Sequence, residues 1–128
     1  MVKICNQPDD NNANYDTVFG QYPFELSDFQ KYAIQGIHEN KHILITAHTA
    51  SGKTLPAEHA IQYFTSRNKR VIYTTPLKAL TNQKTNDFKK KFTETSFGTI
   101  TGDIKTNLEA QCLLMTTEIL RNTLIINK

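Results

Sequence analysis

The sequence has few cysteines and no long hydrophobic run. Its 128 residues contain two cysteines, Cys5 and Cys112. No apolar segment approaches the roughly 20 residues of a membrane span, and the polar N-terminus lacks the apolar core of a signal peptide. We therefore predict an intracellular protein, in the nucleus or the cytoplasm, with no membrane partner and two free thiols. Cys112 lies in an apolar run and is interpreted as a small core residue rather than a metal ligand.

Metal-binding spacings and internal repeats are also missing. His38, His42 and His59 do not follow a ligand spacing, so we predict no metal site other than one for Mg²⁺. No repeat occurs, and no low-complexity tract occurs beyond the polar first residues. The composition, 38% hydrophobic and 21% charged, is typical of a folded domain. The length suits about one domain with a modest core.

The net charge of +3 is unevenly placed along the chain. Residues 1–28 carry one Lys and five acidic residues, whereas residues 67–91 carry eight Lys or Arg and one acid, Asp87. A basic segment inside a folded domain suggests a phosphate-bearing partner. The alternative is a solvated helix face, which we favour for the stretch FKKKF taken alone.

Hydrophobic periodicity predicts a flexible arm followed by alternating strands and helices. Residues 1–23 are polar and aperiodic, and Ser27 with Gln30 forms a capping box for the helix that follows. Leu77, Leu80 and Phe88 are expected in the core. The predicted strands are residues 43–46, 71–74, 98–101 and 112–115, and the predicted helices are about residues 26–41, 57–66, 77–92 and 117–126.

This alternation implies crossover connections and a parallel α/β sheet flanked by helices. The predicted strands are continuous apolar runs, as expected when both faces of a sheet are covered. Ligands of such sheets bind where strands end and helices begin. That edge holds the stretches AHTASGKT, TTPLKAL, TGD and MTTEI.

The stretch AHTASGKT, residues 47–54, has the pattern of a phosphate-binding loop. Ala47 stands at the usual first glycine, whereas Gly52, Lys53 and Thr54 match. Gly52 lets the backbone turn closely around phosphates, and successive N–H groups from about Thr49 through Ala50 and Ser51 to Thr54 offset the anion's charge. Lys53 reaches the β- and γ-phosphates, and Thr54 offers a hydroxyl to Mg²⁺.

The alternative for this loop is an ordinary strand-to-helix turn that begins a helix with a lysine. A lysine at a helix N-terminus opposes the macrodipole unless an anion is present, which argues against that alternative. Pro56 is accepted only in the first turn of a helix, so it places the helix start just before it. We therefore predict nucleotide binding at this loop.

With these motifs in place, the sequence resembles the first RecA-like domain of superfamily two helicases, specifically DExH-box RNA helicases of the superkiller and exosome-cofactor type. The resemblance rests on five stretches in the family's order, spanning residues 24–122: FELSDFQKYAI, ILITAHTASGKT, VIYTTPLKALTNQK, TGDI and LLMTTEILRN. It implies a RecA-like phosphate-loop fold, ATP and Mg²⁺ as cofactors, and single-stranded RNA as the favoured partner over DNA. It also implies a second RecA-like domain and exosome-type RNA decay machinery as partners.

The resemblance assigns roles to individual residues. Phe24 and Gln30 match positions that contact adenine, although Gln30 is equally explained by the capping box. Three stretches match motifs that contact the RNA backbone, and we expect phosphate contact there without base readout. Thr116 or Thr117 is also explained by capping of the last helix. The matching residues are Thr75, Pro76, Lys78, Asn82 and Gln83; Thr101, Gly102 and Asp103; and Thr116, Thr117, Glu118 and Arg121.

The family's Asp-Glu-x-His motif is expected after the last helix, and the sequence ends at Lys128 before it. We therefore expect residues 24–128 to be the N-terminal part of the ATP-binding domain, with a sheet incomplete at the C-terminus and no complete catalytic set. The favoured function is the ATP-binding portion of a 3′-to-5′ RNA helicase. One alternative is a non-catalytic nucleotide- or RNA-binding module. Another is a small nucleotide kinase, which is disfavoured because Arg67, Arg70 and Arg121 are not well placed for phosphoryl transfer.

Overall fold

The computed structural model describes residues 15–46 and 52–126, and the chain divides into two compact units, residues 1–60 and 61–128. The first contains α1 (Asp16–Phe19), α2 (Asp28–His38) and the start of α3 (Thr54–Thr65). The second contains the end of α3, four strands, α4 (Lys78–Lys91) and α5 (Thr117–Ile126).

Helix α2 begins where the sequence predicts. Ser27 is its N-cap and the predicted capping box is present, with the Ser27 backbone N–H donating to Gln30 Oε1 at 2.9 Å. Ala33, Ile34 and Ile37 are buried along one face of the helix. Part of the predicted arm is ordered as well, since Asp16–Phe19 form α1. The flexible character of the rest of the arm stays a prediction, because residues 1–14 lie outside the described residues.

The predicted strand at residues 43–46 does not form. This segment has no regular structure, and Leu44 is 90% exposed. A strand needs a neighbour that satisfies its backbone N–H and C=O groups. The described residues of the first unit form helices only, so they offer Ile43–Thr46 no strand to pair with.

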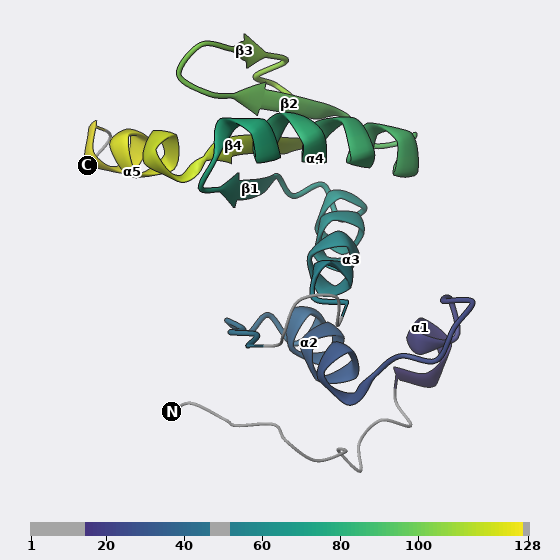
Figure 1. Cartoon of the computed structure of the whole chain (residues 1–128). Helices are drawn as coiled ribbons and strands as arrows, with labels where there is room; N and C mark the ends of the chain where they lie inside the picture. Colours follow the sequence, from purple (N-terminus) through teal and green to yellow (C-terminus); the bar gives the residue numbers. More distant parts are fainter. Residues whose placement is uncertain (1–14, 47–51, 127–128) are drawn as a thin grey trace. The chain divides into compact units, whose positions relative to one another are not determined.

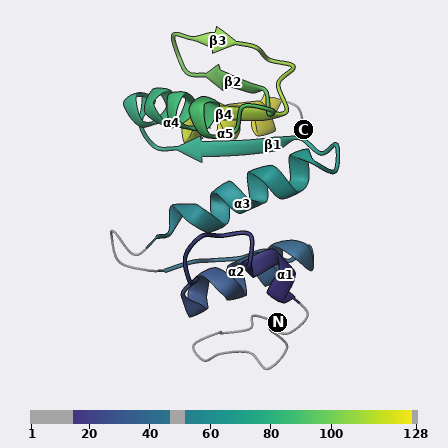
Figure 2. The same ribbon diagram turned by 90° about the vertical axis from the view of Figure 1, so that its right-hand side faces the viewer.

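The second unit is built on a four-stranded sheet in the order β1-β4-β2-β3 (Figure 2). β1 (Val71–Thr75) and β2 (Phe97–Ile100) each pair in parallel with β4 (Cys112–Thr116), as predicted. The short β3 (Lys105–Thr106) was not predicted, and it pairs antiparallel with β2 at the edge. Gly98 permits this pairing, because a Cβ there would collide with the carbonyl oxygens of Thr106 and Asn107.

The two faces of the sheet carry separate apolar clusters. α4 lies along one face (Figure 1), where Phe88, Phe92, Phe97, Cys112 and Leu114 are buried together with Ile61 of α3. Leu113, Met115 and Ala110 are buried on the other face, against Ile119 and Leu120 of α5. The buried positions of Cys112 and Phe88 confirm that they belong to the core.

Both of the predicted core leucines are exposed instead. Leu77 is 60% exposed and Leu80 is 38% exposed. The buried face of α4 is formed by Thr81, Thr85 and Phe88. The threonine hydroxyls explain this choice, because each meets a hydroxyl of the sheet: Thr81 Oγ1 lies 2.7 Å from Thr75 Oγ1 and Thr85 Oγ1 lies 3.0 Å from Thr99 Oγ1. Buried hydroxyls that pair with each other incur little desolvation cost.

Candidate nucleotide and nucleic-acid sites

The C-terminal end of the predicted phosphate loop leads directly into α3. Gly52 has φ +86°, a left-handed conformation that favours glycine. Lys53 is exposed, and Thr54 is the half-buried first residue of the helix. Pro56 lies in the first helical turn, as predicted. Thr49, Ala50 and Ser51 lie outside the described residues, so their predicted N–H contacts to phosphate stay predictions.

Gln30 connects the start of α2 to this loop. Its side chain is 6% exposed, and its Nε2 donates a hydrogen bond to the Gly52 carbonyl oxygen at 3.1 Å. Its Oε1 accepts from the Ser27 backbone N–H. The capping-box explanation of Gln30 therefore holds. An amide has two N–H donors and two oxygen lone pairs. One donor and one lone pair are not used by these two bonds, which leaves the predicted adenine contact chemically feasible.

Phe24, the other predicted adenine residue, presents its ring to solvent. It is 51% exposed, and its ring lies 5.8 Å from that of Tyr22, centroid to centroid. An exposed aromatic ring offers a face on which a nucleobase can stack.

The described part of the loop suits a nucleotide phosphate and its magnesium ion. A positive-φ glycine, an exposed lysine and a helix N-terminus follow one another at Gly52, Lys53 and Thr54. The helix N-terminus and the ammonium both favour an anion, and the Thr54 hydroxyl is an oxygen ligand of the kind that Mg²⁺ takes. Within the described ranges, no group of three His, Cys, Asp or Glu side chains is arranged to hold another metal.

The predicted RNA-contacting residues gather at one edge of the sheet in the second unit. Thr75 ends β1, Thr116 ends β4 beside it, and Thr101 follows β2. Because β1, β4 and β2 are parallel, their carboxyl ends meet at the same edge. The N-termini of α4 and α5 lie at this edge too, since each helix follows β1 or β4 directly.

The threonines of this edge hold its turns together. Thr75 donates through Oγ1 to the Leu77 carbonyl at 2.9 Å, and Thr101 Oγ1 accepts from the Ile104 N–H at 3.2 Å. Thr117 Oγ1 donates to the Thr75 carbonyl at 3.2 Å, which ties the start of α5 to the end of β1. The Thr116 hydroxyl is buried and has no hydrogen-bond partner in the described part of the chain, so it does not cap α5.

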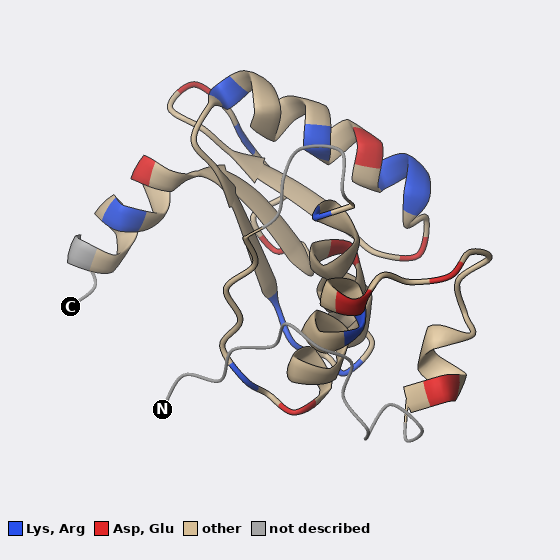
Figure 3. Ribbon diagram, turned by 60° about the horizontal axis from the view of Figure 1, so that its bottom comes forward, with Lys and Arg blue, Asp and Glu red and all other residues tan. Residues whose placement is uncertain are grey.

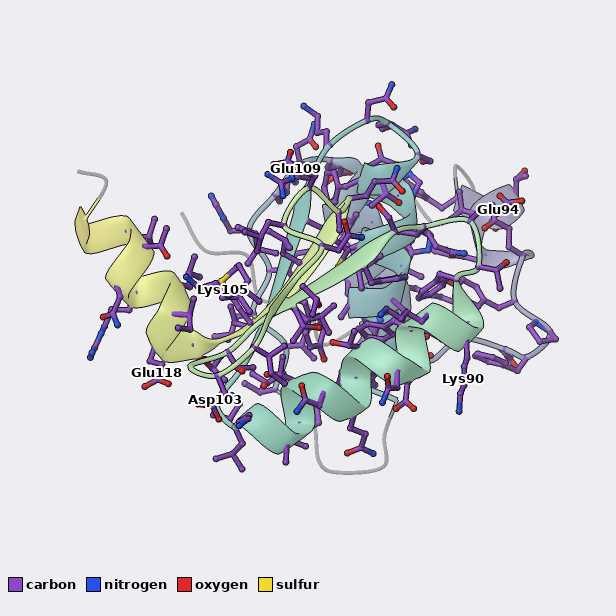
Figure 4. All side chains as sticks on the ribbon, turned by 90° about the horizontal axis from the view of Figure 1, so that it is seen from above. Lys90, Glu94, Asp103, Lys105, Glu109 and Glu118 are labelled. Atoms are coloured by element: carbon purple, nitrogen blue, oxygen red, sulfur yellow. The ribbon has the colours of Figure 1, made fainter. Side chains whose placement is uncertain are left out.

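The remaining predicted contact residues are available to a ligand, and their charges are mixed. Lys78 at the start of α4 forms an ion pair with Asp103, and the Lys78 ammonium lowers the pKa of the Asp103 carboxyl. Asp103 and Glu118 lie at the same end of the sheet, whereas Lys90 and Glu94 lie at the far end of α4 (Figure 4). The exposed residues of the edge are Pro76, Lys78, Gln83, Gly102, Asp103, Thr117, Glu118 and Arg121, and Asn82 is half-buried.

Positive charge gathers along α4 (Figure 3). Lys89, Lys90 and Lys91 occupy its last turn and are exposed. This position agrees with a solvated helix face, where lysines also favour the negative end of the helix dipole.

A histidine pair in the first unit was not predicted as a functional feature. His59 Nε2 lies 2.9 Å from His38 Nε2, and His59 Nδ1 lies 2.7 Å from the Tyr22 hydroxyl oxygen. Burial, and to a lesser extent the charge of His38, lower the pKa of His59 to about 4. The three residues are 37 and 21 positions apart along the chain. No local spacing in the sequence could have indicated that they meet.

The fold and both candidate sites define an α/β protein of the phosphate-loop type. A family model described as DEAD/DEAH box helicase matches residues 27–128, so the chain belongs to this family. Within the described residues, no helix has the length and apolar character needed to cross a membrane.

Individual helicases are similar to the chain over most of its length. It is 48% identical over 103 residues to the antiviral helicase SKI2 of Saccharomyces cerevisiae, covering 80% of this chain and 8% of that protein. It is 47% identical over 104 residues to the human exosome RNA helicase MTR4, covering 81% and 10%. It is 46% identical over 101 residues to the DExH-box ATP-dependent RNA helicase DExH9 of Arabidopsis thaliana, covering 79% and 10%. The resemblance to superkiller and exosome-cofactor helicases is thereby confirmed, and the chain spans about a tenth of the length of these relatives.

Proposed function

We propose that the chain is the ATP-binding portion of an ATP-dependent RNA helicase that acts in RNA processing or decay. The observation that carries the proposal is the position of Lys53, exposed after a positive-φ glycine and directly before the first residue of α3. Lys53 would bind the β- and γ-phosphates of ATP, and Thr54 would hold Mg²⁺, whose role is to neutralise charge on the transferred phosphate. Membership of the DEAD/DEAH box family supports the use of ATP.

The carboxyl edge of the sheet is the proposed RNA surface. Lys78 and Arg121 supply exposed positive charge there, and the N-termini of α4 and α5 supply backbone N–H groups. These groups suit the phosphates of a single strand and carry no base specificity. The predicted roles of Asn82, Gln83 and Thr117 belong to the same proposal. The exosome-type partners and the intracellular location are proposed from the named relatives and the composition.

The 128 residues contain no Asp-Glu-x-His sequence. Positioning of Mg²⁺ and of the attacking water is worth orders of magnitude in phosphoryl transfer. We therefore expect these residues alone to bind nucleotide without appreciable turnover. The second candidate, a non-catalytic nucleotide- or RNA-binding module, is favoured by the same observation. Lys53-dependent phosphate release that RNA stimulates would contradict this second candidate.

Equilibrium binding of ATP to the chain, with and without Mg²⁺, tests the proposal. Replacement Lys53→Ala is expected to weaken ATP binding by about tenfold or more, because a charge-assisted contact to phosphate is lost. Lys69→Ala is the matched control, since Lys69 is an exposed lysine in the turn after α3. Equal ATP binding by the wild-type chain and the Lys53→Ala variant would refute the phosphate-loop assignment.

A further inference from the structure

Two contacts, one at each end of α2, connect it to the phosphate loop and to α3, the helix that follows the loop. At the N-terminal end, Gln30 donates to the Gly52 carbonyl at 3.1 Å. At the C-terminal end, His38 Nε2 lies 2.9 Å from Nε2 of His59, which belongs to α3. The second contact has no explanation in phosphate binding, because His59 lies beyond the first helical turn, where phosphates are held.

The histidine pair is also hydrogen-bonded to Tyr22. The Tyr22 hydroxyl oxygen lies 2.7 Å from His59 Nδ1, so both ring nitrogens of His59 have partners. His59 is 6% exposed, and a buried imidazole that lost either bond would keep an unsatisfied polar atom. The three side chains therefore form a continuous hydrogen-bonded chain that joins residue 22 to α3 and to α2.

Tyr22 lies close in the sequence to Phe24, the exposed ring at the predicted adenine position. Only Pro23 separates them, and proline fixes its own φ and restricts the residue before it. The Tyr22 and Phe24 rings also lie 5.8 Å apart, centroid to centroid. Holding Tyr22 in place therefore restricts where the Phe24 ring can lie.

We propose that Tyr22, His59 and His38 are positioning residues that hold the Phe24 segment against α3 before adenine binds. This inference rests on the proposed function, because it assigns Tyr22, His59 and His38 to the same nucleotide site. A ring that is already in place loses less conformational entropy when a base stacks on it. The three residues act on the adenine end of the ligand alone, and Lys53 acts on the phosphates.

A metal site does not explain the cluster. His38 and His59 supply two imidazoles, whereas a zinc site takes three or four protein ligands, and the described residues supply no group of three His, Cys, Asp or Glu side chains. The 2.9 Å separation of the two Nε2 atoms is that of a direct hydrogen bond.

The test compares the binding of ATP with that of inorganic triphosphate, which lacks adenine. Tyr22→Phe keeps the ring and removes only the hydroxyl, and we expect ATP affinity to fall about fivefold to tenfold while triphosphate affinity is unchanged. Tyr63→Phe is the matched control, since it removes a phenol oxygen from the same helix as His59 while keeping the ring that Arg67 covers at 3.7 Å. The control is expected to bind both ligands as the wild-type chain does.

Variants of His38 give an independent measurement. His38→Leu removes the hydrogen bond between the two Nε2 atoms and is expected to weaken ATP binding in the same selective way. His38→Gln supplies an amide group that can restore the bond, and it is expected to recover the affinity. Nitrogen-15 NMR of the imidazoles, without any nucleotide, should show that Tyr22→Phe changes the protonation pattern of His59.

Each outcome decides the proposal. An equal loss of ATP and triphosphate affinity in Tyr22→Phe would show that the three hydrogen-bonded side chains only support the fold. Unchanged affinities would show that these side chains do not position the Phe24 ring. Either result overturns the proposal and leaves the phosphate-loop assignment standing. A wild-type chain that binds neither ligand would instead refute the proposed function, and the positioning role with it.

Discussion

The side-chain amide of Gln30 and the carbonyl oxygen of Gly52 are joined by a hydrogen bond of 3.1 Å. The approach is so close that a Cβ on Gly52 would lie 2.5 Å from Gln30 Nε2. The positive φ of Gly52 favours glycine, and a Cβ there would also require the Gln30 amide to move. The residue predicted to contact adenine and the loop predicted to contact phosphate are mechanically connected through this bond.

Replacing Gln30 separates its two structural roles. Gln30→Glu keeps a carboxylate oxygen for the Ser27 N–H, which is a favourable capping box, but it removes the donor to Gly52. Gln30→Ala removes both bonds. We expect Gln30→Ala to lower the free energy of unfolding by about 1–2 kcal/mol and Gln30→Glu to lower it less, as measured by urea denaturation.

The same two variants of Gln30 are also expected to affect nucleotide binding. Both variants are expected to weaken ATP binding, because both release the Gly52 carbonyl. Gln62→Ala, on the exposed side of α3, serves as the control and should change neither property. If Gln30→Glu bound ATP as tightly as the wild-type chain, the Gln30–Gly52 bond would have no part in the site.

Asp103 is expected to oppose RNA binding at the sheet edge. Its carboxylate holds the Lys78 ammonium in an ion pair, so a phosphate must compete for that lysine. Asp103→Asn removes the competing charge and is expected to tighten the binding of a short single-stranded RNA severalfold, with a steeper dependence on salt. Fluorescence anisotropy over a range of salt concentrations measures both effects.

The charge change itself needs a control. Asp87→Asn adds the same net charge on an exposed position of α4 that is not part of the predicted RNA motifs. It is expected to change affinity much less than Asp103→Asn. Equal effects of the two variants would mean that RNA responds only to net charge, and the ion pair would then carry no specific role.

Much of the second unit could be predicted from the sequence because its elements are defined by local patterns. β1 and β4 are continuous apolar runs, and α4 and α5 begin directly after them, so their boundaries were predicted to within a residue or two. The parallel direction of β1 and β4 followed from the alternation of strands and helices. The antiparallel β3 was missed because two residues carry no periodicity.

The features that were predicted wrongly or missed have a common cause. Each depends on contacts with residues that are distant in the sequence. Ile43–Thr46 has the composition of a strand, but the described residues of its unit contain no strand that could lie beside it. Leu80 follows the apolar stripe of α4, yet the buried face is decided by the hydroxyls of Thr75 and Thr99 on the sheet. The Tyr22–His59–His38 chain is likewise invisible to any local pattern. The Lys53 and Thr54 positions followed from a motif, and their ligand contacts remain predictions.

The stability of the second unit is expected to depend on Phe88 rather than on Leu80 of α4. Phe88 is 1% exposed and packs edge-on against Tyr73, with ring centroids 5.3 Å apart. Phe88→Ala should therefore lower the free energy of unfolding by about 3–5 kcal/mol. Leu80→Ala, at a position that is 38% exposed, should cost well under half as much. Thermal and urea denaturation measure the difference, and similar losses for both variants would show that Leu80 is buried after all.

The lowered pKa of His59 predicts how the free energy of unfolding depends on pH. The pKa of His59 is lowered to about 4, chiefly by burial, whereas an unfolded histidine titrates near its ordinary value of about 6.5. Between these two values the unfolded chain binds a proton that the folded chain does not. The free energy of unfolding should therefore fall as the pH is lowered from about 6.5 towards 4, by at most about 1.4 kcal/mol per pH unit for this one proton.

His59→Gln isolates this contribution, because the variant has no proton to take up at that position. His38 acts on His59, and Glu58 acts on Tyr22, the other hydrogen-bond partner of His59. His38, Tyr22 and Glu58 are all retained in the variant. Between pH 7 and pH 5, unfolding free energies should decline more steeply for the wild-type chain than for His59→Gln. His42→Gln, at an exposed histidine, should follow the wild-type slope. Parallel slopes for the wild-type chain and His59→Gln would contradict this prediction, because they would mean that His59 accepts its proton in the folded state as readily as in the unfolded one.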